Sequence, residues 1–156
     1  MKSTVVIAPY SKYMRNNEQN PKNFPHFAKV TGFLASKGLY IVQVGGLGEV
    51  TLTDVHKTAF GLSMKSIEEL VRQSMFFISV DNFLHHLAYH VGKRGIVIWG
   101  QSDPSLFGYP FHTNVLKSRD NLRPNQFDMW ESVKFNPDTF PTGEEVCNII
   151  AEKYNL

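Results

Sequence analysis

Short apolar runs recur along the chain, and stretches with helical spacing lie between them. The runs are rich in β-branched and aromatic residues, and each is apolar throughout instead of alternating with polar positions. This pattern is typical of strands that are covered on both faces in a parallel sheet. It predicts buried strands over Thr4–Ala8, Leu39–Val44, Met75–Val80 and Gly95–Trp99, and a further short strand near Thr113–Leu116.

The stretches between the strands carry apolar residues three and four positions apart, which is the spacing of one helix face. The first of them is followed by Gly38, a natural helix stop. In the second, Ser66 and Glu69 have the spacing of a capping box at a helix N-terminus. The predicted helices are Phe24–Ser36, Ser66–Gln73, Asn82–His90 and a final helix from about Thr142 to Tyr154.

Strands that alternate with helices indicate right-handed βαβ crossovers and a doubly wound, mostly parallel α/β sheet. Two regions are less regular: residues 10–23 are polar and are expected to form a long loop, and residues 101–141 contain several prolines. No internal repeat, low-complexity tract or linker divides the sequence. We therefore expect a single domain over residues 1–156.

Composition narrows the function classes. The 156 residues are about the size of one domain. A formal net charge of +2 gives no basic field that would favour nucleic acid as a partner. Cys147 is the single cysteine, which excludes a disulfide framework and a multi-cysteine metal site, and its helical surroundings predict a packed thiol.

The N-terminal segment has only a short apolar run before Pro9. The run is too short for the apolar region of a signal peptide and far too short to span a bilayer. The longest apolar runs elsewhere have the length of strands. We expect a soluble, cytoplasmic protein without a membrane span.

In an open parallel sheet, ligands bind beyond the carboxyl ends of the strands, where helix N-termini direct free N–H groups outward. Four predicted strand ends carry small, hydroxyl, amide or charged residues that suit an anionic ligand with hydroxyl groups. These segments are Pro9–Lys12, Val44–Glu49, Asp81–His86 and Gly100–Pro104. A nucleotide is the simplest interpretation.

The turn after the second strand contains Gly45, Gly46 and Gly48, followed by Glu49. The glycines permit close backbone approach to a phosphate, but the spacing is not G-x-G-x-x-G and no P-loop lysine follows. An ordinary tight turn is the alternative. Glu49 could accept both hydroxyls of a ribose, as acidic residues do in dinucleotide folds, or be a solvated loop charge.

Asp81 and Asn82 stand at a strand-to-helix junction, where either side chain could cap the helix. Alternatively, Asp81 could bind sugar hydroxyls while Asn82 and the following backbone amides contact a diphosphate. The two roles are compatible. His86, in the first helical turn, suits a phosphate contact, and a core histidine with satisfied hydrogen bonds is the alternative.

His86 and His90 are one helical turn apart, which is a metal-ligand spacing. No acidic residue completes an H-E-x-x-H arrangement, so we predict no metal site. Three cations, Lys12, Arg15 and Lys22, lie along the polar loop after the first strand. One of them could neutralise a phosphate, or all could be solvated. The spacing shows no Ser/His/Asp or Cys/His triad.

Ser79–Ala88 resembles the D-[ST]-G-x-x-H-x-A motif of the ADP-heptose:lipopolysaccharide heptosyltransferases, which form glycosyltransferase family 9. Four further segments resemble motifs of that family in the same order. They are Val5–Pro9 (a strand ending in Pro-Gly-Ser), Lys22–Pro25 (Lys-x-Trp-Pro), Gly45–Glu49 (Gly-Gly-x-x-Glu) and Trp99–Pro104 (Phe-Gly-Pro-Thr-Asp-Pro). The resemblance covers about residues 4–117 and leaves residues 118–156 as a C-terminal extension that includes the terminal helix.

The resemblance is to the C-terminal, sugar-nucleotide-binding half of these enzymes. It implies one Rossmann-like half of a GT-B architecture, in which the N-terminal half holds the acceptor and supplies the proposed base. It also implies that Asp81 binds the donor sugar and is the catalytic candidate, while Asn82 and His86 contact the diphosphate. Lys22 would bind a phosphate and Glu49 the ribose. The full expected nucleotide-sugar site is Ser11, Lys22, Gly45, Gly46, Glu49, Asp81, Asn82 and His86.

The chain departs from the family pattern at two positions of this motif. Phe83 stands where the family has glycine, so it could block the diphosphate or reshape the pocket; Asn82 replaces a Ser or Thr. Residues 122–131 lie outside the family motifs. There, Phe127 and Trp130 could pack against the sheet, or they could form an interface for a partner or a second copy.

The resemblance favours a heptosyltransferase-like domain that binds a nucleoside diphosphate sugar, such as an ADP-heptose-like donor, for metal-independent transfer without a further cofactor. Because the length matches half of a two-domain enzyme, the acceptor site is expected from a partner chain or a homodimer. The first alternative is a non-catalytic nucleotide- or sugar-nucleotide-binding module. The second, which Phe83 supports, is an interaction protein that has lost the ligand.

Overall fold

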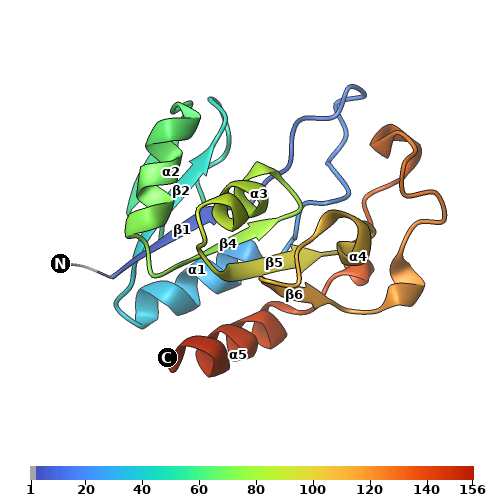
Figure 1. Cartoon of the computed structure of the whole chain (residues 1–156). Helices are drawn as coiled ribbons and strands as arrows, with labels where there is room; N and C mark the ends of the chain where they lie inside the picture. The colour runs from blue at the N-terminus through green and yellow to red at the C-terminus, as the bar shows by residue number, and fades with distance from the viewer. Residues whose placement is uncertain (1–2) are drawn as a thin grey trace.

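The computed structural model describes residues 3–156; Met1 and Lys2, which begin the segment tested above for a signal peptide, lie outside the described residues. A six-stranded sheet has the strand order β3-β2-β1-β4-β5-β6, and every neighbouring pair is parallel. Helices α2 and α3 cover one face, and α1 and α5 cover the other (Figure 1). The predicted Rossmann-like, doubly wound α/β fold is confirmed.

The strands lie close to the predicted ranges. They are β1 (Thr4–Ala8), β2 (Tyr40–Gly45), β3 (Lys57–Phe60), β4 (Phe76–Val80), β5 (Gly95–Trp99) and β6 (Thr113–Leu116). The pattern had predicted β1, β5 and β6 with these bounds, and it had placed the start of β2 and β4 one residue early. It had missed β3, an edge strand in which Ala59 is the one buried residue.

The helices are α1 (Phe27–Ser36), α2 (Met64–Gln73), α3 (Phe83–His90), α4 (Pro104–Phe107) and α5 (Gly143–Tyr154). Helix α1 begins later than predicted because Phe24 precedes a proline, which disfavours helical dihedrals. It ends before Gly38, whose φ of +76° confirms the predicted stop. The predicted capping box is wrong: Ser63 is the N-cap of α2 and accepts a hydrogen bond from the Ser66 N–H, and Ser66 lies inside the helix.

Two clusters of apolar side chains form the core, one on each face of the sheet. Alternate residues of β1 point to opposite faces, so Val5 belongs to the cluster under α1 and α5, and Val6 to the cluster under α2 and α3. In the first cluster, the thiol of Cys147 is buried and lies 3.8 Å from the Lys29 carbonyl oxygen, as expected for a packed cysteine.

Two irregular segments extend beyond the carboxyl edge of the sheet. One is the loop over residues 10–23, and the other follows β6 through three short 3₁₀ turns, Arg119–Asn121, Trp130–Ser132 and Pro137–Thr139, before α5 (Figure 1). Within residues 3–156, no helix combines the length and the apolar character needed to cross a bilayer.

Candidate functional site

A hollow of about 560 Å³ lies at the carboxyl edge of the sheet, and we call it the Asp81 hollow. The ends of β1, β2 and β4 meet there, between β1 and β4, where the order of the strands along the chain reverses. Ligands of doubly wound folds bind at this switch point. The lining residues are Tyr10, Ser11, Lys12, Tyr13, Lys22, Gly46, Glu49, Asp81, Asn82, Phe83 and His86, which include every predicted site residue except Gly45.

A second hollow of about 360 Å³ adjoins the first and shares Glu49 and residues 10–13 with it. Its remaining lining residues are Val50 and six residues of the loop: Met14, Asn17, Glu18, Gln19, Asn20 and Asn23. The two hollows are therefore neighbours on the same edge of the sheet.

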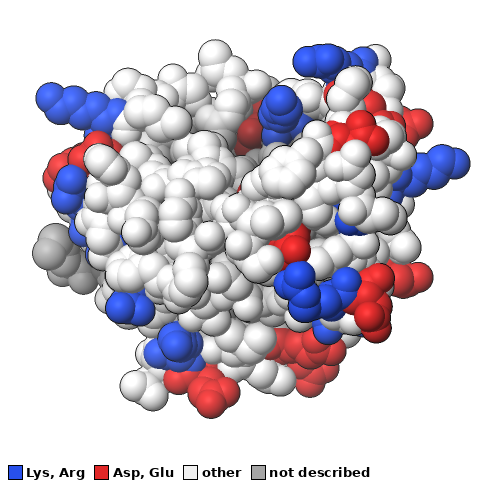
Figure 2. All heavy atoms as spheres, turned by 45° about the vertical axis from the view of Figure 1, so that its right-hand side comes forward, with Lys and Arg blue, Asp and Glu red and all other residues white. Residues whose placement is uncertain are grey.

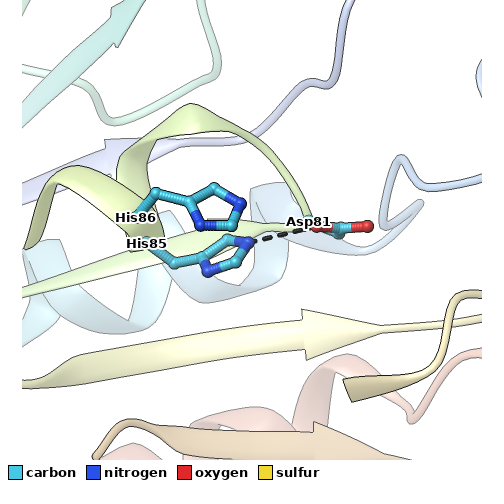
Figure 3. A group of neighbouring side chains, drawn as sticks. All are labelled: Asp81, His85 and His86. Carbon is cyan, nitrogen blue, oxygen red and sulfur yellow. Dashed lines mark hydrogen bonds and ion pairs between the residues drawn. The ribbon is translucent and has the colours of Figure 1, made fainter. Parts of the chain in front are cut away.

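Asp81 follows β4 directly and is engaged by two basic side chains. One carboxylate oxygen lies 3.0 Å from the Lys22 ammonium nitrogen, and the other lies 3.1 Å from Nε2 of the fully buried His85 (Figure 3). Burial raises the pKa of Asp81, but the hydrogen bond with His85 and the ion pair with Lys22 outweigh it and hold that pKa below its ordinary value. Asp81 is therefore an anion.

His86 reaches the Asp81 hollow from the first turn of α3 and is oriented by Tyr109. Its Nδ1 lies 2.7 Å from the Tyr109 hydroxyl oxygen, and the Tyr109 ring stacks on Tyr89 at a centroid distance of 4.0 Å. Burial lowers the pKa of His86, and the nearby His85 lowers it further. A neutral His86 with Nδ1 engaged by Tyr109 leaves Nε2 to meet a ligand.

Asn82 takes the capping role that the sequence allowed. Its Oδ1 accepts a hydrogen bond from the Leu84 N–H at the start of α3. Its Nδ2 donates to the carbonyl oxygens of Ala8 and Tyr10, at 2.9 and 3.1 Å, and so ties this turn to the end of β1. Because both amide hydrogens are used, a diphosphate would meet the backbone of this turn instead of the Asn82 side chain.

The turn that carries Glu49 is held by a buried side chain of β2. Gln43 donates to the Val50 carbonyl oxygen and accepts from the Leu52 N–H, each at 2.9 Å. Glu49 Oε1 accepts from the Gly46 N–H at 3.1 Å, whereas its buried Oε2 has no hydrogen-bond partner among the described residues. Burial raises the pKa of Glu49. The Glu49 carboxylate is therefore held against this turn, with Oε1 at the Gly46 N–H and Oε2 beside Gly45.

The two adjacent glycines of this turn have different roles. A Cβ added at Gly45 would overlap the Glu49 carboxylate, whereas one added at Gly46 would lie 3.8 Å from it, at ordinary contact distance. Gly45 therefore makes room for the acidic side chain, and Gly46 lines the hollow. This explains why Gly45 is absent from the lining.

Asparagine side chains fix the loop over residues 10–23. Asn23 accepts from the Ser11 N–H at 2.8 Å, and Asn20 donates to the Lys12 carbonyl oxygen and accepts from the Lys22 N–H, each at 2.9 Å. Of the three cations that spacing alone could not rank, Lys22, which the resemblance had singled out, is the one that pairs with Asp81. Lys12 also lines both hollows, and Arg15 lines neither.

Among residues 3–156, one group of three acidic or histidine side chains is close enough to share a metal ion. It consists of Asp81, His85 and His86, whose potential ligand atoms lie within 4.8 Å of one another (Figure 3). The spacing had pointed to His86 with His90, but His90 is exposed and outside this group. The Lys22 ammonium, 3.0 Å from Asp81, would repel a dication there.

The surface around this edge carries mixed charges. Figure 2 shows Lys and Arg side chains scattered among Asp and Glu around a largely uncharged centre. Such a mixed charge pattern suits a small anion bound in a local hollow better than a long polyanion.

Phe83, which stands where the family motif has glycine, lines the Asp81 hollow and also packs against the core cluster on the α2–α3 face.

Trp130, in the C-terminal extension, lines neither hollow but lies beside Lys22, a contact for which the sequence had given no signal. The Lys22 nitrogen lies 4.9 Å from the centroid of the Trp130 ring. The suggested packing against the sheet is wrong for Phe127, whose side chain is 79% exposed and meets Phe107.

No family model matches the chain, and no curated protein matches it. Several solved structures do. The E. coli heptosyltransferase WaaC with ADP matches with a TM-score of 0.66 and 18% identity, over 97% of this chain and 44% of that chain. The iron-containing heptosyltransferase TibC in complex with ADP-D-beta-D-heptose gives 0.69 and 20%, over 99% and 46%. A glycosyl transferase of family 9 from Veillonella parvula gives 0.68 and 14%, over 97% and 46%.

At these identities the likeness establishes the fold. The chain spans less than half the length of the heptosyltransferases that it matches. Its six parallel strands have the order expected for one Rossmann-like unit. The chain thus has the fold of one half of the GT-B heptosyltransferases of glycosyltransferase family 9.

Proposed function

We propose that this chain binds a nucleoside diphosphate sugar in the Asp81 hollow and acts as the donor-binding part of a glycosyltransferase. The observation that carries the proposal is the convergence of Lys22, Asp81 and Glu49 on one hollow at the switch point of the sheet. The Lys22 ammonium and the N-terminal end of α3 would attract the diphosphate. The Asp81 and Glu49 oxygens would accept hydrogen bonds from sugar hydroxyls.

The matched structures suggest which nucleotide to test first. WaaC was solved with ADP and TibC with ADP-D-beta-D-heptose. In glycosyl transfer, the bond from the anomeric carbon to the diphosphate breaks as the acceptor oxygen bonds to that carbon, and the acceptor proton passes to a base. Lys22 and His86 would stabilise the charge of the departing diphosphate. A partner chain or a second copy would supply the acceptor site, and a cytoplasmic location is part of the proposal.

A non-catalytic binding module is the second candidate, and the state of Asp81 favours it. Its carboxylate is held by Lys22 and His85, and its pKa lies below the ordinary value. Such a group is a weak base, so this hollow can hold a sugar nucleotide without activating an acceptor. Turnover of the bound donor, measured with and without a co-encoded partner or cell extract, distinguishes the two candidates.

A thermal-shift panel with ADP-, UDP-, GDP- and CMP-sugars tests the binding itself. A ligand that binds only the folded state raises the unfolding temperature, and we expect the ADP-sugar to raise it most. The absence of a shift with every member at millimolar concentration would refute both candidates. If a shift occurs, Asp81→Ala should weaken binding of the sugar nucleotide more than binding of the bare nucleotide. Equal losses would contradict a sugar-facing Asp81.

A further inference from the structure

The segment over residues 122–131 is folded around one buried guanidinium. Arg123 is 5% exposed, and it donates hydrogen bonds to the carbonyl oxygens of Gln126, Asp128 and Met129. A charged group that donates to three carbonyl oxygens of the same short segment fixes the path of its backbone. The segment therefore has a defined conformation although it contains little regular secondary structure.

The same segment is attached to the carboxyl end of β5. The Arg123 N–H donates to the Gln101 carbonyl oxygen at 3.1 Å. The Gln126 side chain donates to that same oxygen and accepts from the Asp103 N–H, each at 2.9 Å. The segment is thus fixed to the edge of the sheet at which the Asp81 hollow lies.

These contacts place Trp130 between the extension and the loop after β1. The Trp130 ring centroid lies 3.5 Å from the guanidinium carbon of Arg123 and 4.9 Å from the Lys22 nitrogen. Both distances are within the range of cation–π contacts. The neighbouring Glu131 accepts a hydrogen bond from the Arg15 N–H at 3.2 Å, so the contact between the two segments is not confined to one side chain.

We propose that Trp130 is a positioning residue for Lys22, so that the C-terminal extension forms part of the anion-binding site; this inference rests on the proposed function. An ammonium has three N–H donors, and within residues 3–156 the Lys22 ammonium has one hydrogen-bonded partner, Asp81. An aromatic face attracts the charge without accepting a conventional hydrogen bond. Trp130 therefore restrains Lys22 while leaving donors for a phosphate.

Restraint increases affinity because a flexible lysine loses rotamer entropy when it binds a ligand. Contacts with Asp81 and Trp130 impose that cost in the free protein, so less remains to be lost when the diphosphate arrives. Replacing Trp130 by leucine keeps an apolar side chain and removes the π face. Replacing it by phenylalanine keeps an aromatic face.

Isothermal titration with ADP tests the inference in the full chain. We expect Trp130→Leu to weaken ADP binding about threefold to tenfold, and Trp130→Phe to retain most of the affinity. Phe127→Leu is the matched control, because Phe127 lies on the same segment and points to Phe107; its ADP affinity should equal that of the wild type. In a Lys22→Gln background, Trp130→Leu should cause no further loss.

A second measurement needs no ligand. The Trp130 ring should shift the ε-methylene protons of Lys22 upfield in the NMR spectrum, and Trp130→Leu should remove that shift. The absence of an upfield shift in the wild type would overturn the inference even if Trp130→Leu does not fold. Far-UV circular dichroism and thermal unfolding establish that each variant is folded.

The two hypotheses fail in different ways. The first case is that the wild type binds ADP and Lys22→Gln weakens this binding. If Trp130→Leu then has no effect on ADP affinity, or the same effect in the wild type and in the Lys22→Gln background, the positioning role is wrong and the proposed function stands. If the wild type binds neither ADP nor an ADP-sugar at millimolar concentration, both are wrong.

Discussion

The Lys22 ammonium nitrogen lies 3.0 Å from a carboxylate oxygen of Asp81, and this ion pair joins the loop after β1 to the end of β4. The side chains are 19% and 7% exposed, so water solvates neither charge freely. The pair crosses the switch point of the sheet, where the proposed ligand would bind. It is therefore part of the fold and part of the candidate site at the same time.

Asp81→Asn should lower the free energy of unfolding by about 2–4 kcal/mol, because it leaves the Lys22 charge without its partner in a poorly hydrated place. Urea unfolding at pH 7 measures this. Glu68→Gln is the control: it breaks the exposed Arg72–Glu68 pair, whose side chains are 50% and 33% exposed, and should cost about 0.5 kcal/mol or less. Equal losses in the two variants would contradict a buried, structural ion pair.

Asp103 should make stability sensitive to acid through Arg119. Both Arg119 terminal nitrogens donate to its carboxylate, at 3.1 and 2.9 Å. These bonds, together with hydrogen bonds from the Ser105 N–H and hydroxyl, lower the Asp103 pKa from 3.8 to about 2. As pH falls from about 4 toward 2, the unfolded chain takes up a proton that the folded chain does not, so stability falls.

Arg119→Gln raises the folded pKa of Asp103 toward the ordinary value, so its stability should fall less across that interval. The stability difference between wild type and Arg119→Gln, measured by urea unfolding, should therefore be present above about pH 4 and close as pH approaches 2. In an Asp103→Asn background, Arg119→Gln should leave the pH profile unchanged. A wild-type advantage that grows toward pH 2 has the wrong sign for this account.

Asn82→Ala should be more costly than the loss of an ordinary helix cap. It removes the bond to the Leu84 N–H and leaves the Ala8 and Tyr10 carbonyl oxygens without their amide donor. We expect a loss of about 2–3 kcal/mol in urea unfolding. Ser63→Ala, which removes the exposed cap of α2, should cost about 1 kcal/mol. If the two substitutions cost the same, the tie between β1 and α3 contributes nothing.

Gly45 and Gly46 should differ sharply when each is replaced by alanine. Gly45→Ala drives a methyl group into the Glu49 carboxylate and should destabilise the fold by about 1–3 kcal/mol, whereas Gly46→Ala should be tolerated. Adding Glu49→Ala to Gly45→Ala should restore part of the lost stability, as thermal unfolding will show. Failure of this second substitution to restore any stability would mean that Glu49 is not what Gly45 accommodates.

Much of the fold could be predicted from the sequence because the buried strands consist almost entirely of apolar residues. The run at Gly95–Trp99 has no polar residue, and its bounds agree with β5. Strand β3 does not show this pattern, because it lies at the sheet edge and three of its residues are not buried. Helix α4 was not predicted because it has only four residues, although the Asp103–Pro104 pair at its start is a recognisable helix N-terminus.

The site could be predicted only in part. Residues at strand ends, such as Glu49, Asp81 and His86, meet because the carboxyl ends of parallel strands share one edge of the sheet. The contact between Trp130 and Lys22 depends on a long irregular segment returning to the loop after β1, and no local pattern records that path. The pairing of Tyr109 with His86 depends in the same way on two segments that pack together only in the folded chain.

The central claim is that the Asp81 hollow binds a nucleoside diphosphate sugar, and mapping the bound ligand on the protein tests it most directly. Titration of an ADP-sugar into ¹⁵N-labelled protein should shift the backbone amide resonances of Ser11, Gly46, Asn82 and His86 together and saturate with one affinity. Lys22→Gln should weaken that affinity by about tenfold. Saturable shifts confined to another surface, or no shifts at millimolar ADP-sugar, would contradict the claim.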